Sequence, residues 1–167
     1  MKGFGSKKKS KNKKINNLTT DNFKEQIIYK AFKFHSEGNI SEATKYYQSF
    51  IKQGFKDFRV FSNYGFILLG QGNFKDAELC VRKAIELKPD YAEAHLNLGN
   101  ILKYLGKLED AKFCYHKAIK LKPDFAFAYY NLGHTYNNQK KFSDAFDCYK
   151  KTIELESDGF SNDLEKE

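Results

Sequence analysis

The chain has 167 residues, of which 41% are hydrophobic and 30% charged, and its formal net charge is +8. This length and composition fit a soluble globular domain with a sizeable core. No run of apolar residues is long enough to span a membrane, and no apolar segment follows the charged start, which argues against a secretory signal. Three cysteines are too few for a disulfide framework and fit a reducing compartment, so we expect a cytoplasmic protein.

Lysine dominates the first 22 residues, which hold seven lysines and one aspartate and include the run KKKSKNKK at 7–14. Charge runs of this kind are usually solvated, so we predict a disordered basic tail over residues 1–22. The weaker alternative is that these lysines bind nucleic acid or an acidic membrane surface. No aromatic residue lies within the run, which disfavours sequence-specific recognition.

From residue 23 onward the sequence repeats every 34 residues. The segments NYGFILLGQGNFKDA at 63–77, NLGNILKYLGKLEDA at 97–111 and NLGHTYNNQKKFSDA at 131–145 align without gaps, and a weaker copy precedes them. Each copy carries two apolar stripes at helical spacing. We predict helix pairs at 24–37 with 41–53, 58–71 with 75–88, 92–105 with 109–122, and 126–139 with 143–156.

The turns have their own signals. Gly72 and Gly106 suit a left-handed backbone after the first helix of a pair. A proline ends the second helix of two pairs, at Pro89 and Pro123, and Asp90 or Asp124 is expected to cap the helix that follows. A single pair cannot bury its own apolar stripe, so the pairs are expected to stack into a solenoid.

This pattern resembles the tetratricopeptide repeat (TPR) consensus of 34 residues. The consensus has small residues where Gly65, Gly99 and Gly133 stand, and alanine at Ala77, Ala111 and Ala145. The resemblance implies an all-α TPR solenoid that forms a right-handed superhelix segment. Its four helix-turn-helix repeats would occupy 24–57, 58–91, 92–125 and 126–157, followed by a short acidic tail at 158–167. No capping helix is evident after residue 156, so the last helix is expected to expose a hydrophobic face that favours self-association or docking of a further domain.

The first helix of each pair lines the concave face in TPR proteins, which bind peptides and partner proteins there. The resemblance therefore implies a protein–protein interaction scaffold and not an enzyme. A carboxylate clamp is not expected, because Ile28 and Phe32 stand where that TPR subfamily has lysine and asparagine. The implied peptide-binding residues lie on the first helices of the last three pairs: Arg59, Asn63, Phe66, Asn97, Asn100, Lys103, Tyr104, Phe127, Tyr130, Asn131 and His134.

Three of these residues, Asn63, Asn97 and Asn131, occupy one place in three copies and resemble the asparagine ladder of O-linked N-acetylglucosamine transferase. Amide side chains both donate and accept hydrogen bonds, so a row of them can pair with the backbone of an extended peptide. The alternative is that the amides only bond neighbouring helices. TPR arrays also resemble the substrate-recruiting arms of larger transferases, and this chain could be a stand-alone relative of such an arm.

No catalytic or cofactor-binding motif is present, and we predict neither a cofactor nor a metal site. Cys80, Cys114 and Cys148 are spaced by the repeat length. Equivalent positions on stacked helices lie about 8–10 Å apart, whereas zinc requires sulfur atoms about 2.3 Å from one ion. These cysteines are therefore interpreted as packing residues.

Overall fold

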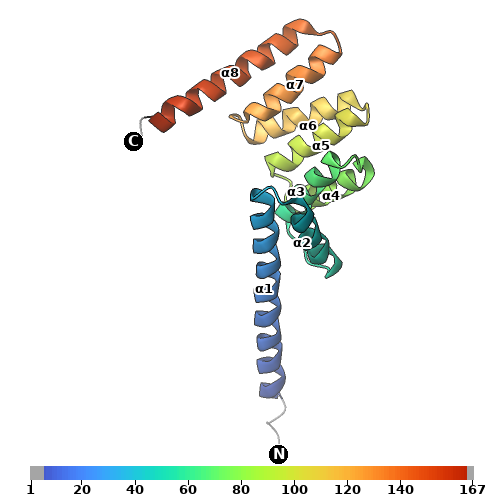
Figure 1. Cartoon of the computed structure of the whole chain (residues 1–167), viewed down its shortest axis with the longest axis vertical. Helices are drawn as coiled ribbons and strands as arrows, with labels where there is room; N and C mark the ends of the chain where they lie inside the picture. The colour runs from blue at the N-terminus through green and yellow to red at the C-terminus, as the bar shows by residue number, and fades with distance from the viewer. Residues whose placement is uncertain (1–5, 165–167) are drawn as a thin grey trace, which may run out of the picture. The chain divides into compact units, whose positions relative to one another are not determined.

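The structure is a computed structural model that describes the backbone of residues 6–164 and the side chains of residues 21–157. This part of the chain is entirely helical between its turns, which confirms the predicted all-α class (Figure 1). The helices are α1 Ser6–Ser36, α2 Ile40–Lys52, α3 Phe58–Gly70, α4 Phe74–Leu87, α5 Ala92–Tyr104, α6 Leu108–Leu121, α7 Ala126–Asn138 and α8 Phe142–Leu164.

The chain divides into two compact units, Met1–Lys56 and Asp57–Glu167. In the first unit α1 packs against α2. Ala31 of α1 and Ala43 and Tyr47 of α2 are fully buried. His35 Nδ1 and the Tyr47 hydroxyl oxygen lie 2.9 Å apart, and burial lowers the pKa of His35. This unit is therefore a helix pair tied together by both apolar and polar contacts.

The second unit contains three stacked pairs, α3–α4, α5–α6 and α7–α8. Each pair meets the next through its second helix, so α4 packs against α5 and α6 against α7 (Figure 1). The first helices also contact one another in succession, α3 with α5 and α5 with α7, whereas the second helices have no comparable contact. The first helices therefore form an inner layer and the second helices an outer layer.

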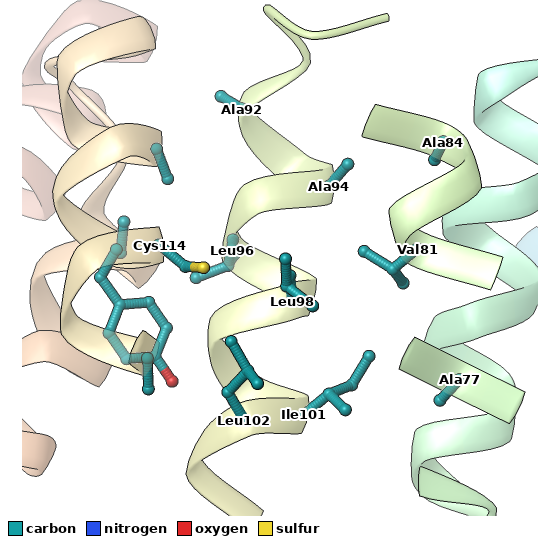
Figure 2. Close-up of a cluster of buried hydrophobic side chains, with 14 of the residues drawn as sticks. Ala77, Val81, Ala84, Ala92, Ala94, Leu96, Leu98, Ile101, Leu102 and Cys114 are labelled. Carbon is teal, nitrogen blue, oxygen red and sulfur yellow. The ribbon is translucent and has the colours of Figure 1, made fainter. Parts of the chain in front are cut away.

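The core of the second unit lies between these layers. Leu98 and Ile101 of α5 point toward α4, on the side where Val81 lies (Figure 2). On the other side of α5, a Cβ placed on Gly99 would lie 2.5 Å from Cε1 of Tyr115, whose side chain is fully buried. A glycine at this place thus lets α5 approach the large ring of α6 closely.

Most helix boundaries between residues 36 and 142 agree with the sequence prediction to within one residue. The outer ends differ, because α1 begins at Ser6, inside the range predicted as a disordered tail, and α8 continues to Leu164, through most of the range predicted as an acidic tail. The lysine-rich segment 6–22 contains neither proline nor glycine, and lysine is a good helix former, so nothing local stops a helix there.

The predicted aspartate caps are wrong. The N-cap residues of α5 and α7 are Tyr91 and Phe125, neither of which makes a side-chain cap hydrogen bond. Each helix thus begins one residue later than an Asp90 or Asp124 cap would require. The ring of Tyr91 packs instead edge-on against Phe58, with ring centroids 4.8 Å apart.

The turn prediction is confirmed, since Gly72 and Gly106 have φ angles of 78° and 74°. The fourth repeat has Lys140 at the same place, and its φ is 59°. The hydrogen bonds are the same in both turns: Gly106 N–H donates to Lys103, and Lys140 N–H donates to Asn137. The last turn therefore keeps the backbone of the repeat although it lacks the glycine.

Candidate functional site

The first helices of the second unit present one continuous surface, which we call the inner surface. Four places on each helix form it, at helical spacing and in register from repeat to repeat. They hold Arg59, Asn63, Phe66 and Gly70 on α3, Glu93, Asn97, Asn100 and Tyr104 on α5, and Phe127, Asn131, His134 and Asn138 on α7. None of these residues is fully buried. The half-buried ones are Asn63, Glu93, Asn97, Asn100, Asn131 and His134, and the others are exposed.

Two members of the predicted asparagine ladder join neighbouring repeats. Asn97 Nδ2 donates to the hydroxyl of Ser62, a fully buried side chain on α3, over 3.1 Å. Asn131 Nδ2 donates to the Phe127 carbonyl over 2.9 Å, and Asn131 Oδ1 accepts from Lys103 Nζ over 3.1 Å. These two amides therefore stabilise the stack, and each keeps part of its hydrogen-bonding capacity.

The third member, Asn63, makes no side-chain hydrogen bond within the described residues and is half-buried. Asn100, one turn further along α5 from Asn97, accepts from the Tyr115 hydroxyl over 2.9 Å. On α7, Asn138 Nδ2 lies 3.3 Å from His134 Nδ1. The amides of the inner surface consequently differ in how many hydrogen bonds they already make within the protein.

Aromatic side chains stand exposed between these amides. Phe66 is 50% exposed and Phe127 is 68% exposed. Tyr104 is also exposed, but its ring stacks on Phe74 with centroids 5.6 Å apart and an interplanar angle of 12°. Tyr130 lies beside Tyr149 of α8, with centroids 5.9 Å apart. Exposed aromatic rings of this kind anchor many protein interfaces.

Charge is scarce on these three helices, whose only Asp, Glu, Lys or Arg residues are Arg59, Glu93 and Lys103. The Arg59 guanidinium is committed to Asp57, with Nη2 to Oδ2 at 2.8 Å. Burial opposes ionisation of Asp57, but hydrogen bonds from Arg59 outweigh it and hold the pKa of that carboxyl below its usual value. Glu93 forms an ion pair with Lys122 of the turn that follows α6, with Oε1 to Nζ at 4.0 Å.

Of these three charged residues, Lys103 alone has no oppositely charged group within salt-bridge distance among the described residues. Its neighbour is the neutral Asn131, and burial lowers the pKa of Lys103. A half-buried ammonium bonded to a neutral amide can donate to a carbonyl or carboxylate of a bound chain. Sequence reasoning named Lys103 but missed its bond to Asn131, because side-chain conformation has no sequence signal.

The three cysteines lie apart from the inner surface, on α4, α6 and α8. Burial raises the pKa of each thiol to about 11, so all three are protonated at neutral pH. Within the described residues no group of three His, Cys, Asp or Glu side chains could hold a metal ion. Nor does the same part of the chain contain a helix whose length and apolar character would let it span a membrane.

Comparison with solved structures gives close matches in fold. The crystal structure of MamA has a TM-score of 0.74 at 22% identity, over 96% of this chain and 99% of that chain. The structure of YrrB, described as a TPR protein with an unusual peptide-binding site, has a TM-score of 0.67 at 21% identity, over 86% and 83%. A mutant O-GlcNAc transferase of Thermobaculum terrenum has a TM-score of 0.64 at 23% identity, over 68% of this chain but 22% of that one.

No curated protein matches the chain. Among protein families, the tetratricopeptide repeat matches residues 92–125 and 126–158, and a second TPR repeat family matches residues 65–103. Together these matches cover more than half of the sequence. The two matches of the first family coincide with the helix pairs α5–α6 and α7–α8, and the match of the second family runs from within α3 through α4 into α5. The chain therefore belongs to the tetratricopeptide repeat family.

Proposed function

We propose that the protein is an interaction scaffold that binds an extended peptide, or an extended segment of a partner protein, on the inner surface. The observation that carries the proposal is the row of exposed aromatic and mostly half-buried amide side chains on α3, α5 and α7, which carry only three charged residues. Solvated helix faces are normally rich in charge, as α4 and α6 are here. A surface so poor in charge is suited to contact with another chain.

Different groups of the inner surface would recognise different parts of the peptide. Phe66 and Phe127 offer apolar rings that would cover side chains of the bound segment. Asn63 and the remaining capacity of Asn97 and Asn131 would pair with peptide backbone groups, independently of sequence. Lys103, which is not one of the residues of the inner surface but is bonded to Asn131, would donate to a carbonyl or carboxylate. The similar fold of YrrB, whose structure is described by its peptide-binding site, supports this use of the surface.

The test begins with selection of peptides from a random displayed library on the immobilised full chain. Dissociation constants of the selected peptides are then measured by fluorescence anisotropy for the wild type and for Phe127→Ala and Phe66→Ala. We expect each substitution to raise the Kd by on the order of tenfold, the loss typical of an anchoring ring. Both rings are exposed, so the fold should not change.

Phe113→Ala is the matched control, because Phe113 is 73% exposed and lies on α6, one of the outer helices. It removes the same ring at similar exposure but away from the inner surface. Peptides whose affinity is lowered by Phe113→Ala and unaffected by Phe127→Ala would show that the binding surface has been assigned to the wrong face.

A second candidate is recruitment of substrates to a transferase, favoured by the similarity to the Thermobaculum terrenum O-GlcNAc transferase structure. This chain covers 22% of that chain, so the activity of the larger protein is not carried over. A transferase that modifies the selected peptides only when this chain is added would support the recruiting role. Unchanged modification in the presence of the chain would remove it.

Two further expectations stay predictions. The first is nucleic-acid or acidic-surface binding by the lysine-rich segment, whose side chains up to residue 20 lie outside the described residues. Retention of the full chain on a polyanion at low salt, and its loss on deletion of residues 1–15, would test that role. The second is a cytoplasmic location, which rests on the low cysteine count and on the three thiols being free.

A further inference from the structure

The last helix pair exposes a face that the earlier pairs bury. Ile85 of α4 and Ile119 of α6 are half-buried at the junction with the next pair, whereas Ile153, their equivalent on α8, is 67% exposed. Phe146 is also 67% exposed, although Lys112, one repeat earlier, is buried. We call the surface formed by Phe146, Tyr149, Lys150, Ile153, Glu154 and Ser157, which line a groove on α8, the tail face.

The junction between α4 and the α5–α6 pair shows what completes such a face. A groove there is lined on one side by Arg82, Ile85 and Glu86 of α4. The same three places on α8 hold Lys150, Ile153 and Glu154, two repeats later. The tail face therefore corresponds to the α4 side of the junction groove. Among the described residues, no helix pair follows α8 to supply the other side of such a groove.

The second half of the junction groove consists of residues from α5 and α6, including His95, Leu98, Asp110 and Cys114. Two repeats upstream, the same places hold Ile27, Lys30, Glu42 and Tyr46. These four residues line a groove on α1 and α2 together with Phe23, Gln26, Lys45 and Ser49, and we call this surface the head face. Phe23 is 49% exposed and Lys30 is exposed, so the head face is open to a partner.

The charges of the two faces match the junction inside the chain. Arg82 and Asp110 line the junction groove from opposite sides. Their equivalents are Lys150 on the tail face and Glu42 on the head face, so the signs of both charges are kept. In addition Lys30 replaces the apolar Leu98, and the tail face offers Glu154 as an acidic partner for it.

The sequences that flank the two faces are also complementary in charge. Residues 157–167 hold four acidic residues and one lysine, while residues 1–22 hold seven lysines and one aspartate. Within the chain, a short turn joins the end of α4 to the start of α5. In the proposed contact, the acidic end of α8 in one copy would likewise meet the basic start of α1 in another copy. Opposite charge of this kind favours the encounter of these two ends over that of two like ends.

We propose that the tail face of one copy docks on the head face of a second copy, which continues the stack of helix pairs from molecule to molecule. The contact is heterologous, because the two surfaces differ, so each bound copy offers a further free head or tail face. This inference goes beyond peptide binding, since it uses α8 and the α1–α2 pair and leaves the inner surface of α3, α5 and α7 open.

The test uses the full chain and two blocked variants in analytical ultracentrifugation over a wide concentration range. The tail-blocked variant is Ile153→Glu, and the head-blocked variant is Phe23→Glu with Lys30→Glu. We expect the wild type to show a mass that rises with concentration beyond that of a dimer, and each blocked variant alone to be a monomer. An equimolar mixture should form a dimer and nothing larger, because it retains one compatible pair of faces.

Leu79→Glu is the matched control, since Leu79 on α4 is 68% exposed and lies on neither face. It should associate like the wild type, and circular dichroism should show the same helix content for all variants. As a second measure, Lys150→Glu should weaken association and Glu42→Lys in the partner copy should restore it.

Three results would overturn the proposal. The first is a wild type that stays monomeric at all concentrations. The second is a head-blocked variant that still dimerises, which would indicate a symmetric contact between two tail faces. The third is a mixture of blocked variants that remains monomeric while the wild type associates, which would place the contact elsewhere.

Discussion

The close approach of α5 and α6 at Gly99 can be tested by adding a single methyl group. In Gly99→Ala the new Cβ would lie 2.5 Å from Cε1 and 2.7 Å from Cδ1 of Tyr115. Carbon atoms in ordinary contact are about 3.5–4.0 Å apart, so the ring or the helix must move by roughly 1 Å. The Tyr115 side chain has no exposed surface, and its hydroxyl is bonded to Asn100, so it has little room to move.

Two effects of opposite sign set the magnitude. Alanine is about 0.8–1.0 kcal/mol more favourable than glycine inside a helix, which alone would stabilise the variant. Overpacking a filled core costs about 1–3 kcal/mol. Because the contact at Gly99 is among rigid groups, we place the overpacking cost in the upper part of that range. We therefore expect Gly99→Ala to lower the free energy of unfolding by about 1–2 kcal/mol.

Gly133→Ala provides the internal comparison. Its Cβ would lie 2.9 Å from Cε1 of Tyr149 and 3.1 Å from Cβ of Cys148. The Tyr149 ring is half-buried at the open end of the stack and can shift outward, so the smaller overpacking cost should nearly cancel the gain in helix propensity. Urea unfolding followed by far-UV circular dichroism measures both variants. If Gly99→Ala were as stable as Gly133→Ala, the idea of a rigid contact between Gly99 and Tyr115 would be refuted.

Other outcomes follow from single features. Lys140→Gly should raise the free energy of unfolding by about 0.5–1 kcal/mol, since lysine at a φ of 59° is strained, and Gly106→Lys should lower it; both are read from urea midpoints. Asn97→Ala should lower the free energy of unfolding by about 1–3 kcal/mol, because it leaves the buried Ser62 hydroxyl without its partner. Asn63→Ala should change that free energy by no more than about 0.5 kcal/mol in the same assay. Equal losses in the two variants would contradict the hydrogen bond between Asn97 and Ser62. Alkylation of the three thiols at pH 8 should be at least about 100-fold slower in the folded chain than in urea, because their folded pKa is about 11 while free thiols ionise near 8.5. The unfolded thiols lose protons first as pH rises from about 8.5 to 11, so these groups should make the folded state less stable across that window.

The sequence predicted the stacked helix pairs because the repeat carries redundant information. Glycine and alanine at the close approaches, two apolar stripes and the turn glycines all recur in register, so one irregular copy cannot hide the pattern. The places that lack such signals were predicted less well. The lysine-rich start of α1 has no local stop signal, and α8 continues past Gly159, where the sequence would favour an end. The start of α5 has Tyr91 packed against Phe58 and no cap from the Asp90 carboxylate.

The candidate site was predictable as a set of residues on one face but not as a set of interactions. Helical spacing alone places Asn63, Asn97 and Asn131 on equivalent positions. Which amide bonds to the protein depends on side-chain conformation and on single differences between repeats. Asn97 meets Ser62 of the preceding repeat, whereas Asn131 meets Lys103. The repeat therefore predicts that the three asparagines occupy equivalent positions. The residues that differ between repeats determine what each amide contacts.

The separation of charge between the two helix layers bears on how binding would respond to ionic strength. The chain as a whole is basic, yet α7 carries no Asp, Glu, Lys or Arg, and α3 and α5 carry three between them. Contact with these helices would release few counterions, and long-range attraction would contribute little to the rate of encounter. A ligand held there should thus keep nearly the same affinity from dilute buffer to concentrated salt, while contacts that depend on the lysine-rich end of the chain should fade over the same range.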